Sequence, residues 1–511
     1  MQLSQSSHNC GEQVLGLRLR CDRSRMHAAN GFVFSRTAKF LYHMASPTSN
    51  ERVLIESVSG IRGIIGNGFD PGVVVRYATA YGAWCREQAK TLNRSALVVV
   101  GRDARPSGPA FQRILMGTLQ SMGCDVLDTG LAPTPTIAMS VLQENAVGGV
   151  VLSASHNPLE WNALKLLDHN GEFLDGDAGT SLKARAQAQN DTPVPHHTMG
   201  RYTKTDRVPA HIEALCALPY IDPEVISAQD FTVVVDGCNS VGGQALPLLL
   251  NELGVHDANI VRIHCDPTGQ FGRPPEPRPD HLTDLAEAVA NHNADLGLAV
   301  DPDADRLALV DNEGRIILEE LTQVLAADFM WRHRSGPFVT NLSSSRAIDD
   351  VAARYDEPVY RSAVGEINVV HEMKARDAVL GGEGNGGVIL PDLHYGRDAL
   401  VGTALILQHL AETGASLADL HDDMPQYAMA KDSLPLGTLD VDALLNTLQR
   451  EYADTPHSTI DGLKIDLPEG WVHLRASNTE PILRVYTEAP TPAEAQALAD
   501  RFKNELQVLA G

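Results

Sequence analysis

Ser155 and His156 stand side by side in the segment SASHNP, directly after the apolar run 150–152. A short apolar run of this kind predicts a buried strand, so the serine is expected in a loop at the end of the strand. A hydroxyl presented there can act as a nucleophile, and a neighbouring imidazole can hold or move a proton. The alternative is an ordinary polar turn. The GxSxG elbow of hydrolases is excluded, because Ser153 and Asn157 stand where that motif has glycine.

A second polar segment, DPDADR, follows another apolar run and places Asp301, Asp303 and Asp305 at alternate positions. Three carboxylates so close together repel one another unless a cation lies between them. A ligand set made only of oxygen suits a hard cation, above all Mg²⁺. An EF-hand calcium loop is excluded, because Arg306 and Asn312 stand where that loop needs glycine and glutamate. The alternative is an acidic surface turn.

Two further segments carry groups that suit a phosphorylated sugar. GGEGNGG sets Glu383 and Asn385 among glycines, which let a backbone approach a ligand closely. The two side chains could bind vicinal sugar hydroxyls, although a flexible turn is the alternative. The segment RASNTEP and the strand expected after it could bind a phosphate dianion, or could form a polar hairpin turn. The candidate phosphate ligands are Arg475, Ser477, Asn478, Thr479 and Arg484.

Together the four segments supply a hydroxyl nucleophile, a magnesium site, a hydroxyl-binding loop and a phosphate-binding loop. Phosphoryl transfer depends mainly on positioning and charge neutralisation, and such a set provides both. The chain has no Walker A sequence, so transfer driven by a nucleotide is not indicated.

Short β-branched runs alternate with amphipathic segments and predict the elements that position these loops. Segment 280–292 predicts a helix with Asp280 as its N-cap, and Thr491, Pro492 and Glu494 predict the start of a final helix. Alternation of strand and helix favours α/β units with parallel strands. No internal repeat is evident. The runs typical of buried strands are 97–100, 150–152, 233–235 and 296–300.

The composition limits the classes of function. A chain of 511 residues exceeds the size of one hydrophobic core, so several domains are expected. The net charge of −24 disfavours nucleic acid as a partner, but a local basic pocket could still bind an anionic substrate. Seven cysteines without a CxxC pair favour a reducing compartment. No apolar run reaches the roughly 18 residues of a membrane helix, so we expect a cytoplasmic protein without a membrane partner.

Residues 1–43 differ from the rest of the chain. They are rich in arginine, poor in acidic residues and without periodicity. A transit peptide is one interpretation. A disordered extension, or a start codon assigned too far upstream, is favoured, because the segment beginning at Met44 looks like a natural start.

The motifs, in this order, closely resemble those of the α-D-phosphohexomutases, the family of phosphoglucomutase, phosphomannomutase and phosphoglucosamine mutase. The resemblance begins near Ile55 and includes SVSGIRGIIG (57–66) and VVVGRDARPSG (98–108). It implies an α/β protein with three related α/β domains and a smaller C-terminal α+β domain. It also implies an active site in the central cleft where the four domains meet. The expected domains are 51–203, 204–313, 314–428 and 429–511.

The resemblance also implies roles for individual residues. Ser155 corresponds to the serine that is phosphorylated in the active enzyme. His156 and Lys165 are candidate acid–base or charge-stabilising groups, and Arg62 matches the arginine of the opening motif. The implied ligands of Mg²⁺ are the phosphorylated serine and the carboxylates of Asp301, Asp303 and Asp305.

Substrate-binding residues are implied in the same way. Arg306 is expected near the transferring group, and Glu383 and Asn385 are expected to bind the sugar, with Asn385 in place of the usual serine. Gly387 stands where many members have histidine, so another group must take any part that this histidine plays. The residues implied for the phosphate that does not react are Arg475, Ser477, Asn478 and Thr479.

The implied reaction interconverts a hexose 6-phosphate and a hexose 1-phosphate through phosphoserine and a sugar 1,6-bisphosphate. Glucosamine 6-phosphate ranks first as substrate, because GEGNGG followed by HYGRDAL resembles a group usually assigned as phosphoglucosamine mutases. Phosphomannomutase/phosphoglucomutase activity is the alternative. Two further hypotheses are an inactive phosphosugar-binding regulator and a phosphatase. The expected partner is a small-molecule phosphosugar, and a monomer and a homodimer are both open.

Overall fold

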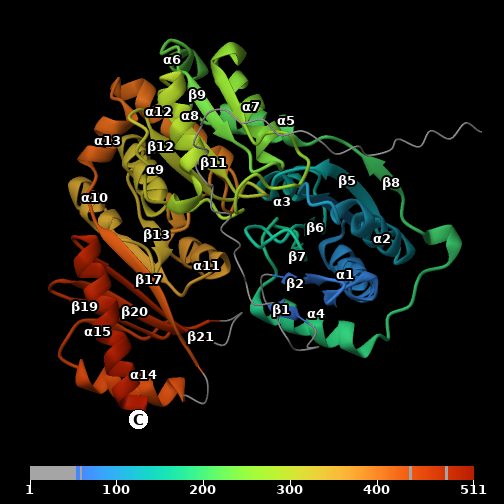
Figure 1. The fold of residues 1–511 in the computed structure, drawn as a ribbon. Helices are drawn as coiled ribbons and strands as arrows, with labels where there is room; N and C mark the ends of the chain where they lie inside the picture. The colour runs from blue at the N-terminus through green and yellow to red at the C-terminus, as the bar shows by residue number, and fades with distance from the viewer. Residues whose placement is uncertain (1–52, 58–59, 437–439, 478–481, 511) are drawn as a thin grey trace, which may run out of the picture. The chain divides into compact units, whose positions relative to one another are not determined.

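The structure is a computed structural model that describes residues 53–57, 60–436, 440–477 and 482–510 (Figure 1). The predicted N-terminal extension, residues 1–43, lies outside the described residues. Asn478 and Thr479 also lie outside them, so their predicted roles stay predictions.

The first α/β domain is built on an eight-stranded sheet. Four central strands are β4 (Leu97–Arg102), β5 (Asp125–Leu131), β6 (Gly148–Leu152) and β7 (Trp161–Leu167). The outer strands are β1 (Leu54–Ser57), β2 (Gly60–Ile65), β3 (Gly68–Phe69) and β8 (Tyr202–Lys204). The helices are α1 (Pro71–Leu92), α2 (Gly108–Ser121), α3 (Thr134–Gln143) and α4 (Gly176–Ala188).

Two four-stranded sheets follow along the chain. The second domain contains α5 (Val208–Cys216), α6 (Pro223–Ser227), β9 (Val233–Asp236), α7 (Gly242–Glu252), β10 (Ile260–Ile263), α8 (Thr283–His292), β11 (Leu296–Val300) and β12 (Leu307–Asp311). The third contains α9 (Glu320–His333), β13 (Phe338–Asn341), α10 (Ala347–Tyr355), β14 (Val359–Ser362), α11 (Glu366–Arg376), β15 (Leu380–Glu383), β16 (Gly387–Ile389), α12 (Ala399–Thr413) and α13 (Leu417–Asp423).

The three α/β sheets share one topology. The spatial orders are β5-β4-β6-β7, β10-β9-β11-β12 and β14-β13-β15-β16. In each order the first three strands are parallel and the last is antiparallel to its neighbour. The structure therefore contains a repeat that the amino-acid sequence does not reveal by eye, and the predicted fold of three related α/β domains is confirmed.

The fourth domain is smaller and has an antiparallel sheet in the order β17-β21-β20-β19-β18. Its final helix begins as predicted, because the Glu494 amide donates to Thr491 Oγ1 at 3.3 Å. The elements are β17 (Ala428–Pro435), α14 (Val441–Glu451), β18 (His457–Ser458), β19 (Leu463–Leu467), β20 (Gly470–Ala476), β21 (Ile482–Ala489) and α15 (Pro492–Ala510).

The predicted buried strands are confirmed, but one helix start is wrong. Residues 97–100, 150–152, 233–235 and 296–300 lie in β4, β6, β9 and β11. Asp280 is not an N-cap, because a short 3₁₀ turn, Pro279–His281, takes it up and α8 begins at Thr283 after Leu282. Proline favours such a tight turn by fixing its own φ, and the sequence pattern did not separate this turn from the helix.

An apolar core joins the three α/β sheets, while the fourth has its own core. One buried cluster includes Val151 of β6, Leu298 of β11 and Leu405 of α12. The fourth domain buries Val472 and Phe502 in a separate cluster. Each such side chain contributes roughly 1.5–3 kcal/mol by leaving water. Residues 51–511 nevertheless form one compact unit.

Polar contacts connect the fourth domain to the third. Lys431 Nζ lies 2.9 Å from Glu319 Oε1. Ser343 Oγ and His473 Nδ1 are 2.8 Å apart.

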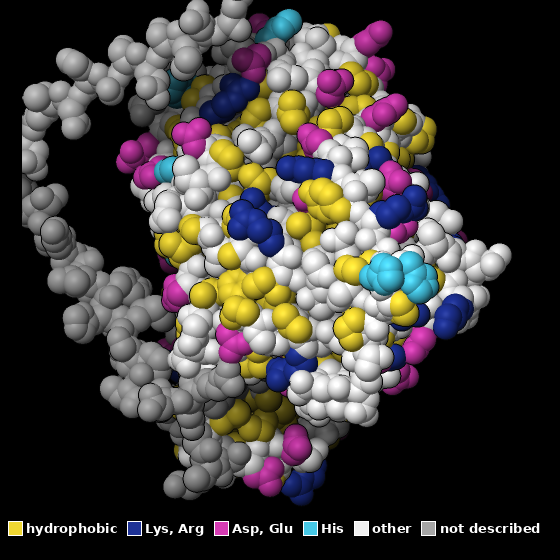
Figure 2. Space-filling model, turned by 90° about the vertical axis from the view of Figure 1, so that its right-hand side faces the viewer, with side chains coloured by type: hydrophobic (Ala, Val, Ile, Leu, Met, Phe, Trp, Pro, Cys, Tyr) yellow, Lys and Arg dark blue, Asp and Glu magenta, His cyan; other side chains and the backbone are white. Residues whose placement is uncertain are grey.

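On the face shown in Figure 2, acidic, basic and apolar side chains are interspersed, with no large area of one charge sign. None of the helices in the described ranges combines the length and apolar character needed to cross a bilayer.

Candidate active site

Three of the four predicted loops occupy the same place in the repeated topology. Ser155 lies between β6 and β7, residues 301–305 lie between β11 and β12, and Asn385 lies between β15 and β16. Each loop therefore follows the carboxyl end of a parallel strand, where α/β sheets commonly bind ligands. The predicted phosphate loop joins β20 to β21.

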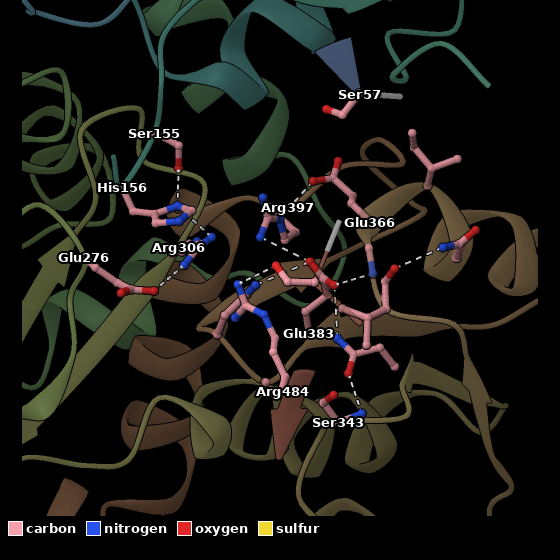
Figure 3. A pocket seen from close by; sticks show the side chains of 18 of the residues that line it. Ser57, Ser155, His156, Glu276, Arg306, Ser343, Glu366, Glu383, Arg397 and Arg484 are labelled. Carbon is pink, nitrogen blue, oxygen red and sulfur yellow. Dashed lines mark hydrogen bonds and ion pairs between the residues drawn. The ribbon is translucent and has the colours of Figure 1, made fainter. Parts of the chain in front are cut away.

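The four loops meet at one pocket of about 1010 Å³, seen from close by in Figure 3. Asp301, Asp303 and Asp305 are fully buried behind the wall of the pocket. Two residues of that wall contact them, because Ser155 donates a hydrogen bond to Asp301 and Lys165 donates one to Asp303. The predicted residues that line the pocket are Arg62, Ser155, His156, Lys165, Arg306, Glu383, Asn385, Arg475, Ser477 and Arg484.

Arg105 holds the serine loop in its conformation. This side chain is fully buried, and its Nε donates to Asp103 Oδ2 at 2.9 Å. Its other N–H groups donate to the backbone carbonyls of Ser155, Asn157, Pro158 and Trp161. All five donors of the guanidinium are thereby engaged, and four of them hold carbonyls of the serine loop.

The backbone of Ser155 is in the left-handed region, with φ of 48°, which is uncommon for a residue other than glycine. Its amide donates to Ser153 Oγ at 2.9 Å, and Ser153 Oγ donates to Asp103 Oδ2 at 2.7 Å. Ser155 Oγ donates to Asp301 Oδ2 at 2.6 Å and lies 3.4 Å from His156 Nδ1. Strain of this kind is typical of functional sites, and here it directs the hydroxyl at a carboxylate.

Asp301, Asp303 and Asp305 form a cluster whose potential ligand atoms lie within 4.8 Å of one another. Burial, followed by the charges of Asp305 and Asp303, raises the pKa of Asp301 well above its ordinary value. Asp303 Oδ1 and Asp305 Oδ1 are buried without a hydrogen-bond partner among the described residues. Buried charged oxygens without donors are costly, and a hard cation takes such ligands. The cluster therefore fits a metal ion.

Two buried cations lie against the same carboxylates. Lys165 Nζ is 2.6 Å from Asp303 Oδ2, and Arg397 Nη2 donates to Asp305 Oδ2 at 2.8 Å. Burial opposes the charge on Lys165, but Asp303 and Asp305 raise its pKa overall. Burial likewise opposes ionisation of Asp305, but Arg397 and Lys165 hold its pKa below the ordinary range. A protonated Lys165 suits charge stabilisation better than it suits a general base.

Arg306 joins the metal loop to the serine loop. Its Nη2 lies 3.0 Å from His156 Nδ1, and its Nη1 donates to Glu276 Oε1 at 3.2 Å. Because a guanidinium can only donate, His156 Nδ1 is the acceptor. The charge of Arg306, followed by burial and Arg62, holds the pKa of His156 well below its ordinary value. His156 is therefore a neutral imidazole in this arrangement.

Glu383 ends β15 and is only 4% exposed. Its Oε1 accepts from Asn341 Nδ2 at 3.0 Å and from the Gly365 amide at 3.1 Å. Its Oε2 lies 3.2 Å from Arg397 Nη1 and accepts from Asn385 Nδ2 at 3.4 Å. Both oxygens of this predicted sugar ligand are thus engaged by the protein.

Two glycines of the sugar loop are required for different reasons. Gly386 has φ of 85°, and a Cβ there would lie 2.4 Å from the Leu307 carbonyl oxygen. At Gly387 a Cβ would instead lie 2.3 Å from Arg397 Cδ. Arg397 thus fills the space beside Gly387, the position at which the sequence lacks the expected histidine.

Arg475 and Arg484 face each other directly across β20 and β21. Arg475 Nε lies 3.0 Å from Asp461 Oδ2, while Arg484 Nη1 donates to Tyr486 Oη at 2.7 Å. Arg484 Nη2 also donates to Ser477 Oγ at 3.4 Å. Opposed like charges on neighbouring strands repel, and an anion between them relieves that repulsion. The pair therefore suits a phosphate.

Sequence reasoning gave no role to Arg105, Arg397 or Glu366. Arg105 stood in a quoted motif, but its carbonyl partners lie 50 to 56 residues away along the chain. Arg397 stood in HYGRDAL, without a signal that it would meet Asp305. Glu366 is the first residue of α11, where an acidic residue is ordinary because of the helix dipole.

Four family models match consecutive parts of this chain. They are described as phosphoglucomutase/phosphomannomutase domains. The matches are alpha/beta/alpha domain I at 55–192, alpha/beta/alpha domain II at 209–314, alpha/beta/alpha domain III at 319–427 and the C-terminal domain at 430–505.

Individual proteins match over nearly the same length. A phosphoglucomutase/phosphomannomutase of Thermococcus kodakarensis is 36% identical over 441 residues, which cover 86% of this chain and 95% of the relative. A phosphoglucosamine/phosphogalactosamine mutase of Sulfurisphaera tokodaii is 31% identical over 455 residues, covering 87% and 97%. A crystal structure of a phosphoglucomutase/phosphomannomutase family protein from Burkholderia thailandensis has a TM-score of 0.75 and 26% identity, covering 90% and 98%.

Proposed function

The chain belongs to the phosphoglucomutase/phosphomannomutase family, and on this premise we propose that it interconverts glucosamine 6-phosphate and glucosamine 1-phosphate. The family matches and the relatives make it a phosphohexose mutase. The observation that carries the proposed mechanism is the 2.6 Å contact between Ser155 Oγ and Asp301 Oδ2, which joins two different domains.

Phosphorylated Ser155 is the donor in the first transfer. The free hydroxyl of the hexose monophosphate attacks phosphorus, the bond from phosphorus to Ser155 Oγ breaks, and a 1,6-bisphosphate forms. A phosphate on Ser155 is a stronger partner for Arg306 than the neutral imidazole of His156. His156 Nδ1 then becomes available to accept the hydroxyl proton and to pass it to Ser155 Oγ, the leaving oxygen, which lies 3.4 Å away.

Charge neutralisation comes from residues around the serine. Mg²⁺, held by phosphorylated Ser155, Asp301, Asp303 and Asp305, would offset the charge of the transferring group. Asp303 Oδ1 and Asp305 Oδ1, which lack hydrogen-bond donors, support that ligand set. Lys165 adds a fixed positive charge beside the same carboxylates.

The second transfer returns the other phosphate of the bisphosphate to Ser155, and the isomeric monophosphate leaves. Arg475, Arg484 and Ser477 bind the phosphate that does not react, together with Asn478 and Thr479 as the sequence predicts. The sugar must therefore bind in two orientations. Contacts from the sugar loop to equatorial hydroxyls permit both.

The choice of glucosamine rests on the GEGNGG and HYGRDAL segments, and the name of the Sulfurisphaera tokodaii relative supports it. The name of the Thermococcus kodakarensis relative supports the second candidate, phosphoglucomutase/phosphomannomutase activity.

A coupled mutase assay tests the proposal. The assay contains Mg²⁺ and a trace of sugar 1,6-bisphosphate, and glucosamine, glucose and mannose 6-phosphates are compared in parallel. We expect preference for glucosamine 6-phosphate and loss of all turnover in Ser155→Ala. A higher kcat/KM for glucose or mannose phosphates would overturn the glucosamine assignment.

The same assay separates the two other classes of function. Release of inorganic phosphate without an isomer would indicate a phosphatase. A folded protein that binds the phosphosugars but isomerises none of them would be a phosphosugar-binding regulator.

A further inference from the structure

Glu366 projects from the start of α11 into the pocket beside Arg397 (Figure 3). Arg397 Nε donates to Glu366 Oε2 at 2.8 Å. The two side chains are 12% and 10% exposed, so each is largely shielded from water but open to the pocket. A carboxylate in this position can contact a ligand directly.

Glu383 and Glu366, the two carboxylates that pair with Arg397 beside the sugar loop, differ in how many hydrogen-bond donors the protein provides to them. Glu383 receives donors on both oxygens, from Asn341, Gly365, Arg397 and Asn385. Glu366 Oε2 accepts a hydrogen bond from Arg397, and Oε1 has no donor among the described residues. Glu366 therefore retains an oxygen for a ligand.

The charges on this side do not balance. Arg397 pairs with Asp305, Glu366 and Glu383 at 2.8, 2.8 and 3.2 Å. Asp305 also pairs with Lys165, but no second cation pairs with Glu366 or Glu383 among the described residues. Burial, partly offset by Arg397 and reinforced by Asp305 and Glu383, raises the pKa of Glu366 to about 7. A ligand that brings its own positive charge would stabilise the carboxylate form.

We propose that Glu366 selects a hexose phosphate that carries an ammonium group on C2, by accepting a charge-assisted hydrogen bond from that group on Oε1. This inference rests on the proposed mutase function and assigns its sugar preference to one residue. A hydroxyl in place of the ammonium could donate one hydrogen bond but could not offset the negative charge. A site whose buried polar group is left without a full set of partners discriminates against such an analogue.

The test compares kcat/KM for glucosamine, glucose and N-acetylglucosamine 6-phosphates in the wild type and in Glu366→Gln. The substitution keeps the size of the side chain and removes its charge. We expect kcat/KM for glucosamine 6-phosphate to fall by about 10- to 100-fold, as for a lost hydrogen bond to a charged group. The value for glucose 6-phosphate should stay within about threefold.

Two further variants separate recognition from a structural effect. Glu366→Asp keeps the charge and should recover part of the preference for glucosamine. Glu276→Gln is the matched control, because Glu276 also lines the pocket and pairs with an arginine, Arg306, on the phosphoryl-transfer side. Glu276→Gln should leave the glucosamine-to-glucose ratio unchanged even where it lowers both values.

An equal loss for all three sugars in Glu366→Gln would overturn the inference and make Glu366 structural. A wild type that prefers glucose or N-acetylglucosamine 6-phosphate would overturn it too. These failures differ from failure of the proposed function, in which the wild type isomerises no sugar phosphate.

Discussion

Two buried clusters of potential metal ligands occur in the described part of the chain, and they differ in the charges of their members. We call them the carboxylate cluster and the histidine cluster. In each, the potential ligand atoms lie within 4.8 Å of one another, and all six residues are buried. The carboxylate cluster is Asp301, Asp303 and Asp305, and the histidine cluster is His211, His394 and Asp398.

In the histidine cluster two imidazoles pair with one carboxylate, although His394 Nδ1 is buried without a hydrogen-bond partner among the described residues. His211 Nε2 and His394 Nε2 lie 2.9 and 3.0 Å from Asp398 Oδ2, and Asp398 Oδ1 accepts from the Leu400 amide at 2.8 Å. Burial opposes ionisation of Asp398, but His211 and His394 hold its pKa below the ordinary range. His211 Nδ1 also lies 2.9 Å from Thr136 Oγ1 of α3. The cluster thus joins the first three domains.

The carboxylate cluster consists of three acidic side chains and contains no basic side chain of its own. Lys165 and Arg397 pair with Asp303 and Asp305, yet one oxygen of each of these two carboxylates has no donor among the described residues. The pKa of Asp301 is raised, whereas the pKa values of Asp305 and Asp398 are lowered. Ligand types alone therefore do not identify a metal site. The charges of the ligands, three carboxylates against one carboxylate with two imidazoles, separate a site for a cation from a structural junction.

Removal of divalent metal should have the largest effect on mutase activity. We expect this effect to arise at the carboxylate cluster and not at the histidine cluster. Chelation should lower mutase activity by at least roughly 10³-fold, about 4 kcal/mol, because the transferring phosphoryl charge would lose its counter-ion. Adding Mg²⁺ should restore the rate and, at 100 times its Kd, raise the unfolding free energy by about 2.7 kcal/mol. Chelation without loss of activity would contradict a metal role for this cluster.

Asp398→Asn should act on stability. It leaves two buried imidazoles without their carboxylate, so we expect the unfolding free energy to fall by about 3–5 kcal/mol in denaturant titrations. Because the folded pKa of Asp398 is lowered, its contribution is present above the unfolded pKa of about 4 and is lost as pH falls below it. The variant should therefore differ least from the wild type at low pH. An unchanged stability at pH 7 would show that the cluster is not a structural junction.

Asp301→Asn should have the smallest effect on stability, and in the opposite direction. It removes one of three mutually repelling buried charges, while its remaining oxygen can still accept from the Asp305 and Arg306 amides. In metal-free buffer the unfolding free energy should stay constant or rise by about 1 kcal/mol. The activity dependent on Mg²⁺ should be lost. A fall of more than about 2 kcal/mol would mean that the charge of Asp301 is balanced within the protein.

Much of the candidate site could be predicted because its chemistry is local in the sequence. SASHNP and DPDADR each follow a run of apolar residues, and these runs do form the strands β6 and β11 that present them. The position of Asp280 could not be predicted, since a 3₁₀ turn and a helix start share the same local signals. The histidine cluster was not predicted, because His211 and Asp398 are 187 residues apart and carry no pattern in common.

The sequence by itself determined the identity of the reacting groups, the buried strands that end beside them and the family to which they belong. Only the tertiary structure decided the pairings: Ser155 with Asp301, Lys165 with Asp303, and Arg397 with Glu366, Glu383 and Asp305. The physical reason is that charge balance in a buried site depends on distances between segments far apart in the chain. Local sequence patterns specify which charges are present, but the packing of the domains specifies which of them meet.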